Sequence, residues 1–272
     1  MPIAFSTLAC PQWSLAQAMQ FAKAQSYQGI EIRGYKGSVL PAEISDQEVA
    51  DIVYAQESTG ITVVALGSSV RLVNPGLDQE LSTARKFIKL AKRVGARFVR
   101  VYGGPIPESV SEGQAIERVG KGLKALAPEA EREGVQVLIE THDDFSYSYR
   151  VKQAVEVADS PAIGVIWDVL HPLRHKETVE QTWEQIGPYV RHVHIKDGIP
   201  HEGIDWNLVP LDTGKVPIGR ILELLSAGEY KDWLCVEWEW LWHKDLSPAE
   251  EALPHELRAL SDVAKRLQIS IT

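Results

Sequence analysis

The chain has 272 residues, a length that suits one large α/β barrel or two small domains. Hydrophobic residues make up 44% and charged residues 24%, which allows a sizeable core and excludes a disordered chain. The formal net charge is -9, so the surface repels phosphate backbones and a nucleic-acid partner is not expected.

The two cysteines, Cys10 and Cys235, are too few for a disulfide framework or a zinc-finger pattern, and we expect both to be reduced and buried. The N-terminal segment lacks the basic region of a signal peptide. No apolar run approaches the roughly 20 residues that span a bilayer. The sequence therefore predicts a soluble, cytoplasmic protein without a membrane partner.

Eight short apolar runs alternate along the chain with longer amphipathic runs, at intervals of about 34 residues, as expected of repeated β/α units. The apolar runs are rich in Val and Ile, as buried parallel strands require. The predicted strands are Pro2–Ser6, Gly29–Arg33, Thr62–Leu66, Phe98–Tyr102, Gln136–Glu140, Gly164–Trp167, His192–Ile195 and Leu234–Trp238. This alternation predicts an α/β fold, a (β/α)8 TIM barrel, with residues 1–272 forming a single domain.

The amphipathic runs carry helix boundary signals. Ser14 precedes a periodic run over residues 15–27, and a last helix is expected from near Pro248 to about Leu267. Capping boxes are predicted at Ser45 with Glu48 and at Ser111 with Gln114. Left-handed C-terminal caps are predicted at Gly60, Gly95 and Gly134. An open doubly wound sheet is the alternative fold, although no G-x-G-x-x-G follows the first strand.

Ionisable residues gather at the carboxyl ends of the last four predicted strands. In a (β/α)8 barrel these ends open onto the active site. The fifth strand leads into Glu140 and His142, the sixth into Asp168 and His171, the seventh into His194, Lys196 and Asp197, and the eighth into Glu237 and Glu239. A single carboxylate at a strand end is usually a helix cap or a solvated residue. Ionisable residues at the ends of four adjacent strands indicate a functional site instead.

One residue from each of these strands forms the expected cluster: Glu140, Asp168, His194 and Glu237. Three carboxylates packed together repel one another, and a divalent cation resolves that repulsion. The oxygen-rich set favours Mn²⁺, with Mg²⁺ or Co²⁺ as alternatives, over a thiolate-rich structural zinc site.

At these residues the sequence resembles the xylose isomerase-like superfamily of sugar phosphate isomerases and epimerases. The resemblance covers nearly the whole chain, through FSTLACPQWSLAQAM, GIEIRG, FVRVYGGP, IETHDDFS, WDVLH, HVHIKD and VEWEW in order. It implies that Glu140, Asp168, His194 and Glu237 are metal ligands, that Glu140 and Glu237 also act as bases, and that His171 contacts substrate. The ketose 3-epimerases of this family carry a substrate-binding arginine where this chain has Pro200.

This set implies metal-dependent enediolate chemistry on a small sugar. A metal that binds both oxygens of a carbonyl and its neighbouring hydroxyl makes the intervening proton removable. Proton return by the second glutamate gives epimerisation, return to the neighbouring carbon gives isomerisation, and loss of a β-hydroxyl gives dehydration. A dehydratase or lyase acting on a keto-sugar or inosose is therefore the main alternative. No Gly-rich phosphate loop stands out, so a non-phosphorylated substrate is favoured.

Further candidates for substrate binding are Lys196, two residues after His194, and His142, two residues after Glu140, because alternate residues of a strand share a face. The alternative for Lys196 is an ion pair with a carboxylate of the site. The alternative for His142 is a hydrogen bond that orients a metal ligand. Arg100 and, more weakly, Glu31 and Arg33 are also candidates, the alternative being a structural Glu31–Arg100 salt bridge.

Aromatic residues provide possible walls for a sugar site, although tryptophan is more often core or an oligomer contact. Trp13 and Trp206 are the best placed for substrate, because both fall in predicted loops after strands. The others considered are Trp167, Trp238, Trp240 and Trp242.

Two other functions are compatible with the fold. A DNA-repair endonuclease on this barrel needs several zinc ions and early histidines, yet the first histidine here is His142. A non-catalytic sugar-binding barrel would be expected to lose one of the four ligands, and all four are present. A homo-oligomer is possible, but no self-complementary surface is evident in the sequence.

Overall fold

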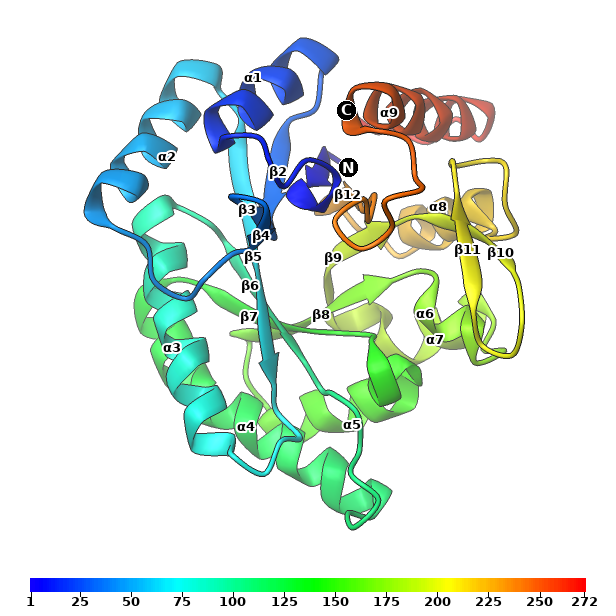
Figure 1. The fold of residues 1–272 in the computed structure, drawn as a ribbon. Helices are drawn as coiled ribbons and strands as arrows, with labels where there is room; N and C mark the ends of the chain where they lie inside the picture. Colours follow the sequence, from blue (N-terminus) through cyan, green and yellow to red (C-terminus); the bar gives the residue numbers. More distant parts are fainter.

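The computed structural model describes residues 1–272 and confirms the predicted (β/α)8 barrel (Figure 1). Eight strands, all paired in parallel, close in the order β1-β12-β9-β8-β7-β6-β5-β2. Their bounds are β1 (Ile3–Ser6), β2 (Gly29–Ile32), β5 (Thr62–Arg71), β6 (Phe98–Tyr102), β7 (Gln136–Glu140), β8 (Ile163–Asp168), β9 (Val190–Ile195) and β12 (Trp233–Val236). Each predicted strand is present, with small differences at the ends.

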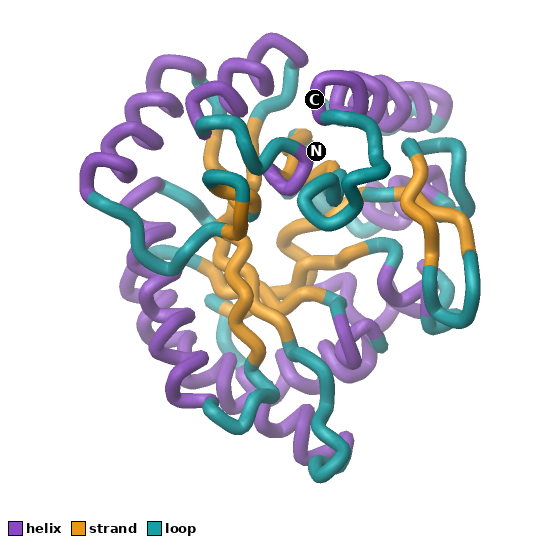
Figure 2. Tube along the Cα trace, in the orientation of Figure 1, coloured by secondary structure: helices purple, strands orange, loops and turns teal.

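The helices form a ring around the strands, as the tube in Figure 2 shows. They are α1 (Leu15–Gln25), α2 (Asp46–Thr59), α3 (Leu77–Val94), α4 (Glu112–Glu133), α5 (Ser148–Ala158), α6 (His171–Arg174), α7 (Val179–Ile186), α8 (Ile218–Ala227) and α9 (Ala249–Arg266). Three short 3-10 turns, η1 (Thr7–Ala9), η2 (Asp143–Ser146) and η3 (Gly187–Tyr189), complete the connections. No helix is both long enough and apolar enough to cross a membrane.

The predicted helix boundaries are confirmed. Ser45 and Ser111 form capping boxes at the starts of α2 and α4. Gly60, Gly95 and Gly134 end α2, α3 and α4 with φ of 77°, 73° and 68°, a left-handed conformation that favours glycine. Local chemistry therefore defines both ends of α2 and α4 and the C-terminal end of α3.

Side chains inside the barrel follow the two-residue period of the strands. The main core lies between strands and helices, whereas a small separate cluster of seven buried residues includes Phe98, Leu138, Ile166 and Cys235. Two residues further along three of these strands come Arg100, Glu140 and Asp168, and Glu237 stands in the same relation to Cys235. The interior thus changes from apolar to charged toward the carboxyl ends of the strands.

Two hairpins lie outside the barrel and were not expected from the sequence. The strands β3 (Gly34–Tyr35) and β4 (Ser38–Val39) form one, directly after β2. The strands β10 (Asp197–Pro200) and β11 (Trp206–Val209) form the other, which projects from the end of β9 beside α6 and α8 (Figure 1). The chain ends meet, since the amide of Thr272 donates to the carbonyl of Met1 at 3.0 Å.

Candidate metal centre

Four adjacent strands bring the predicted metal ligands together. Glu140 and Asp168 are the last residues of β7 and β8. His194 lies near the end of β9, opposite both Asp168 and Cys235 in the pairing, and Glu237 follows β12 directly. The ligand atoms of these four residues, called the pocket cluster below, all lie within 4.8 Å of one another.

The pocket cluster is almost entirely removed from solvent, with exposed fractions between 0 and 4%. The Nδ1 atom of His194 lies 3.0 Å from Oε1 of Glu140 and 3.4 Å from Oε1 of Glu237. Such crowding of carboxylates is costly without nearby positive charge. A cation bound among these carboxylates would therefore be strongly stabilised.

Two basic side chains supply part of that charge. Arg100 places Nη1 at 3.1 Å from Oε2 of Glu140 and at 3.9 Å from Oε1 of Glu237. Lys196 places Nζ at 2.8 Å from Oδ2 of Asp168 and at 2.6 Å from Oε2 of Glu237, and it also pairs with Glu239. Both cations are thus engaged by carboxylates of the site.

The pKa values of the two glutamates move in opposite directions. Burial alone would raise the pKa of Glu140, but the charges of Arg100 and His194 outweigh it and hold that pKa below its usual value. Burial raises the pKa of Glu237, and His194 and Lys196 only partly offset it. The pKa of His194 is raised well above its usual value, because Glu237, Glu31 and Glu140 outweigh the opposing effect of burial. A divalent ion at Nδ1 would take the place of this proton.

The donors of the pocket cluster fit a divalent cation. Oε2 of Glu140 and Oδ2 of Asp168 are buried acceptors that receive no hydrogen bond, although cationic side chains lie nearby. Unsatisfied buried acceptors are uncommon and call for an ion or another donor. Three carboxylates and one imidazole suit Mn²⁺, Mg²⁺ or Co²⁺, and zinc also binds such ligands.

A pocket at the carboxyl ends of the strands reaches this cluster. It is lined by Leu8, Arg33, Arg100, Tyr102, Glu140, His142, His171, Lys196, Glu237, Glu239 and Trp242. The rings of His142 and His171 lie 4.5 Å apart, and Nε2 of His171 is 3.6 Å from Oδ2 of Asp168. Burial, together with His142 and Lys196, lowers the pKa of His171 well below its usual value, so its imidazole is neutral. The predicted residues Arg100, His142, His171 and Lys196 therefore share this pocket with the two glutamates.

The two tryptophans favoured from the sequence, Trp13 and Trp206, are not among the residues that line this pocket, so their role in substrate binding stays a prediction. Trp13 lies in a separate cleft between α1 and α2 and packs on Phe21, with ring centroids 5.0 Å apart. The turn η1 carries the chain away from the strand end before Trp13 is reached. Trp206 lies on β11, and its ring atom Cε3 sits over Gly198 within the hairpin. Leu8 and Trp242 line the pocket instead. Trp242 was among the aromatic residues considered from the sequence, and Leu8 was not a candidate.

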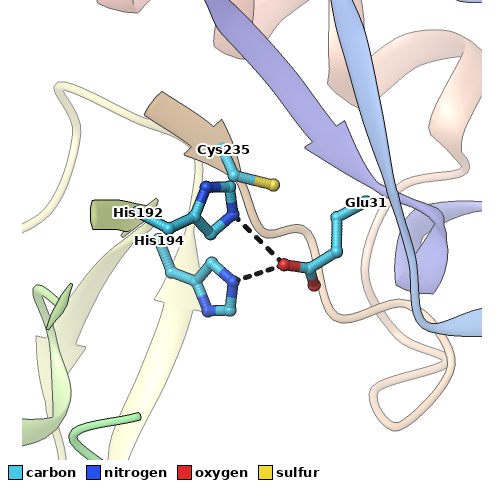
Figure 3. Close-up of side chains that lie close together, drawn as sticks. All are labelled: Glu31, His192, His194 and Cys235. Carbon is cyan, nitrogen blue, oxygen red and sulfur yellow. Dashed lines mark hydrogen bonds and ion pairs between the residues drawn. The ribbon is translucent and has the colours of Figure 1, made fainter. Parts of the chain in front are cut away.

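Behind the pocket cluster lies a second group of potential ligands, Glu31, His192, His194 and Cys235, called the inner cluster below (Figure 3). Oε2 of Glu31 lies 2.8 Å from Nε2 of His194 and 3.2 Å from Nε2 of His192. The hydroxyl of Ser6 donates to Oε1 of Glu31 at 3.2 Å. All four members of the cluster are fully buried.

The salt bridge between Glu31 and Arg100, which was the alternative to a role for these residues at the site, is absent. Arg100 pairs with Glu140 and Glu237, whereas Glu31 pairs with the two histidines of β9. The pairing of Glu31 with these histidines was not predicted, because its partners lie 161 and 163 residues away in sequence. A usable signal was present, since His192 and His194 alternate on one strand and so face the barrel interior together.

The inner cluster is suited to orienting His194. A ligand histidine commonly donates its second ring N–H to a carboxylate, which selects the tautomer and ring orientation for the metal. Glu31 occupies that place, and the two histidines outweigh burial to hold its pKa well below the usual value. Burial raises the pKa of Cys235 well above its usual value, so this residue is a thiol and a poor metal ligand.

Comparisons with known proteins agree with this architecture. Residues 19–263 match the family model of the xylose isomerase-like TIM barrel, so the chain belongs to this family. The IOLI protein, whose crystal structure holds a bound zinc atom, superposes with a TM-score of 0.83 at 18% identity, covering 98% of this chain and 99% of that one. The 3-keto-D-glucoside 4-epimerase of E. coli superposes with a TM-score of 0.75 at 15% identity, covering 96% and 99%.

One curated relative is similar in sequence. The 3-oxo-isoapionate decarboxylase of Pectobacterium atrosepticum is 25% identical over 134 residues, which are 49% of this chain and 46% of that enzyme. The match thus spans about half the length of the relative. The similar proteins are enzymes of this fold with different reactions, so fold alone does not select one.

Proposed function

We propose that this protein is a divalent-metal-dependent sugar isomerase or epimerase that acts through an enediolate. The observation that carries the proposal is the convergence of Glu140, Asp168, His194 and Glu237 in one pocket, with unsatisfied acceptor atoms on two of them. Mn²⁺ is the metal expected, with Mg²⁺ or Co²⁺ as alternatives. When bound, the metal polarises the substrate carbonyl and stabilises the negative charge that develops on its oxygen.

The two glutamates supply the acid and the base. Glu140 and Glu237 come from β7 and β12, which have β8 and β9 between them in the barrel, so they approach a substrate from different sides. One carboxylate removes the proton next to the carbonyl and the other returns a proton on its own side, which inverts the carbon. Return to the neighbouring carbon interconverts aldose and ketose.

The remaining pocket residues bind and orient the substrate. Lys196 and Arg100 are charged donors at hydrogen-bond or ion-pair distance from the reacting carboxylates. His171 and His142 form one wall, and neutral His171 offers a donor or acceptor to a sugar hydroxyl. His171 is buried, which helps to exclude water from the enediolate on that side of the pocket.

A lyase reaction on a keto-sugar is the second candidate. The similarity to a 3-oxo-isoapionate decarboxylase favours this candidate. Loss of CO2 from the carbon next to a carbonyl leaves an enolate, which the same site can stabilise. The two candidates differ in which bond to the substrate carbon breaks, C–H or C–C.

The test is turnover of ketoses, aldoses, inososes and keto-glycosides in D2O, after EDTA treatment, with and without Mn²⁺. Proton NMR should show conversion only with metal, and one solvent deuterium at the carbon next to the carbonyl. Conversion that is equally fast without a divalent ion, or that incorporates no deuterium, would contradict the proposal. Metal-dependent release of water from the same compounds, or of CO2 from a keto sugar acid, would select the lyase.

A further inference from the structure

A third cation, Arg33, lies beside the pocket cluster and is held firmly in place. It directly follows β2, is 6% exposed and lines the pocket. Its Nη1 donates to the carbonyl of Gly67 at 3.2 Å and to the hydroxyl of Ser69 at 2.9 Å. A Cβ atom at position 67 would lie 2.8 Å from Cδ of Arg33, so glycine there lets the side chain pass directly over β5.

Arg33 differs from the other cations of the pocket because no carboxylate pairs with it. Arg100 and Lys196 each contact at least two carboxylates within 4.0 Å, whereas Arg33 contacts none. Its Nε and Nη2 atoms make no hydrogen bond, and neither is among the fully enclosed unsatisfied atoms, so both keep access to solvent on a residue that lines the pocket. Burial and repulsion from Arg100 lower the pKa of Arg33 to about 10, which still leaves it charged at neutral pH.

A buried charge without a counter-ion is costly, and proteins usually provide one. Here the pocket is the place where a counter-ion can enter. The Nε–Nη2 edge of a guanidinium forms two parallel hydrogen bonds to a planar carboxylate. A phosphate commonly also requires backbone amides or a helix N-terminus, and the polar lining of this pocket consists of side chains.

We propose that Arg33 binds a carboxylate of the substrate through its free Nε–Nη2 edge, so that the site takes a sugar acid rather than a neutral sugar. This assignment rests on the proposed function, because it takes the pocket above the metal ligands as the substrate site. The carboxylate then neutralises Arg33, while the carbonyl and hydroxyl groups of the same molecule face Glu140 and Glu237. A neutral sugar would leave Arg33 without a counter-ion and is bound less tightly.

The test compares three compounds of equal chain length: D-ribonate, ribitol and ribitol 5-phosphate. Their affinities are measured by calorimetry with the Mn²⁺-loaded protein. We expect ribonate to bind at least about 10-fold more tightly than ribitol, since hydrogen bonds to a charged group are the stronger ones. Arg33→Gln should weaken ribonate binding by about 10- to 100-fold and leave ribitol unchanged, and Arg33→Lys should retain part of the preference.

The matched control is Arg71→Gln, which removes an arginine of β5 that is paired with Asp143 and lies outside the pocket. It should leave all three affinities unchanged. Unchanged ribonate binding in Arg33→Gln, no ribonate binding at all, or tighter binding of ribitol 5-phosphate than of ribonate would overturn the assignment. Mn²⁺ affinity, titrated separately, should be equal in wild type and Arg33→Gln.

This design separates the two proposals. If the wild type binds no Mn²⁺, the proposed function fails, and the ribonate preference is then measured on the ion-free protein. If Mn²⁺ binds and sugars turn over without any preference for carboxylates, only the role of Arg33 fails.

Discussion

The buried carboxylates on the two sides of His194 have different surroundings. On its Nδ1 side, the pocket cluster packs Glu140, Asp168 and Glu237 together and leaves acceptor atoms without hydrogen bonds. On its Nε2 side, Glu31 is satisfied by two histidines and by Ser6. Both groups have ligand-type residues at metal-like spacing, but the pocket cluster gathers three carboxylates around one imidazole, whereas the inner cluster has one carboxylate that pairs with two histidines. Residue type and proximity alone therefore do not define a metal site; an excess of buried carboxylates at a pocket distinguishes the pocket cluster from the inner cluster.

The largest effect is expected from removing the two bases. Glu140→Gln and Glu237→Gln should each lower kcat by about 10²- to 10⁴-fold, because an amide cannot transfer the proton and is a weaker metal ligand. Steady-state kinetics with saturating Mn²⁺ measures this. Glu256→Gln is the control, since Glu256 is a buried glutamate on α9 outside the pocket. Turnover near the wild-type level in either base variant would contradict the two-base mechanism.

An intermediate effect is expected on the inner side of His194. Glu31→Gln should weaken Mn²⁺ binding by about 10- to 100-fold, because the ring loses the carboxylate that orients it. Calorimetric titration of the EDTA-treated protein measures this.

Cys235→Ser is the matched control within the inner cluster and should leave the affinity and number of bound ions unchanged, since the thiol contacts no polar side chain there. If Cys235→Ser instead lowers the number of ions per chain, the inner cluster itself binds metal and the distinction between the two sides fails.

The last prediction concerns Glu256, a buried carboxyl outside both clusters that has no basic partner. Burial, together with Asp197, raises the pKa of Glu256 to about 8, although the amide of Leu211 donates to it. Because this pKa is higher in the folded chain than in the unfolded one, the folded state binds more protons, and stability falls as pH rises from about 4.5 to about 8.

Relative to wild type, Glu256→Gln should therefore be nearly equal in stability at pH 5 and more stable at pH 8.5 by on the order of a few kcal/mol. Chemical unfolding at the two pH values measures the difference. A stability difference that does not change with pH would show that Glu256 does not titrate in this range.

The sequence was sufficient for the barrel and for all four residues of the pocket cluster. Eight apolar runs with polar residues at their carboxyl ends predict both the strands and their shared rim, because strand direction and two-residue periodicity are local properties. The places of Trp13 and Trp206 could not be predicted, since the direction of a loop depends on its packing. The hairpin β10–β11 is also a product of that packing.

The pairing of Glu31 with His194, and the lack of a partner for Arg33, depend on residues far apart in the chain. Both were noted as weaker candidates, and only the geometry distinguishes them. Arg33 is informative because no carboxylate pairs with it, and the lack of an ion pair cannot be recognised from a sequence.

The central claim is that the pocket cluster holds one divalent cation, and a Mn²⁺ titration tests it most directly. The protein is stripped with EDTA, and bound Mn²⁺ is counted by electron paramagnetic resonance in wild type and in Asp168→Asn. The account predicts one ion per chain in the wild type and an affinity at least about 100-fold weaker in Asp168→Asn, a loss at the upper end of that caused by altering outer-shell partners. No bound ion in the wild type, or equal binding in the two proteins, would contradict it.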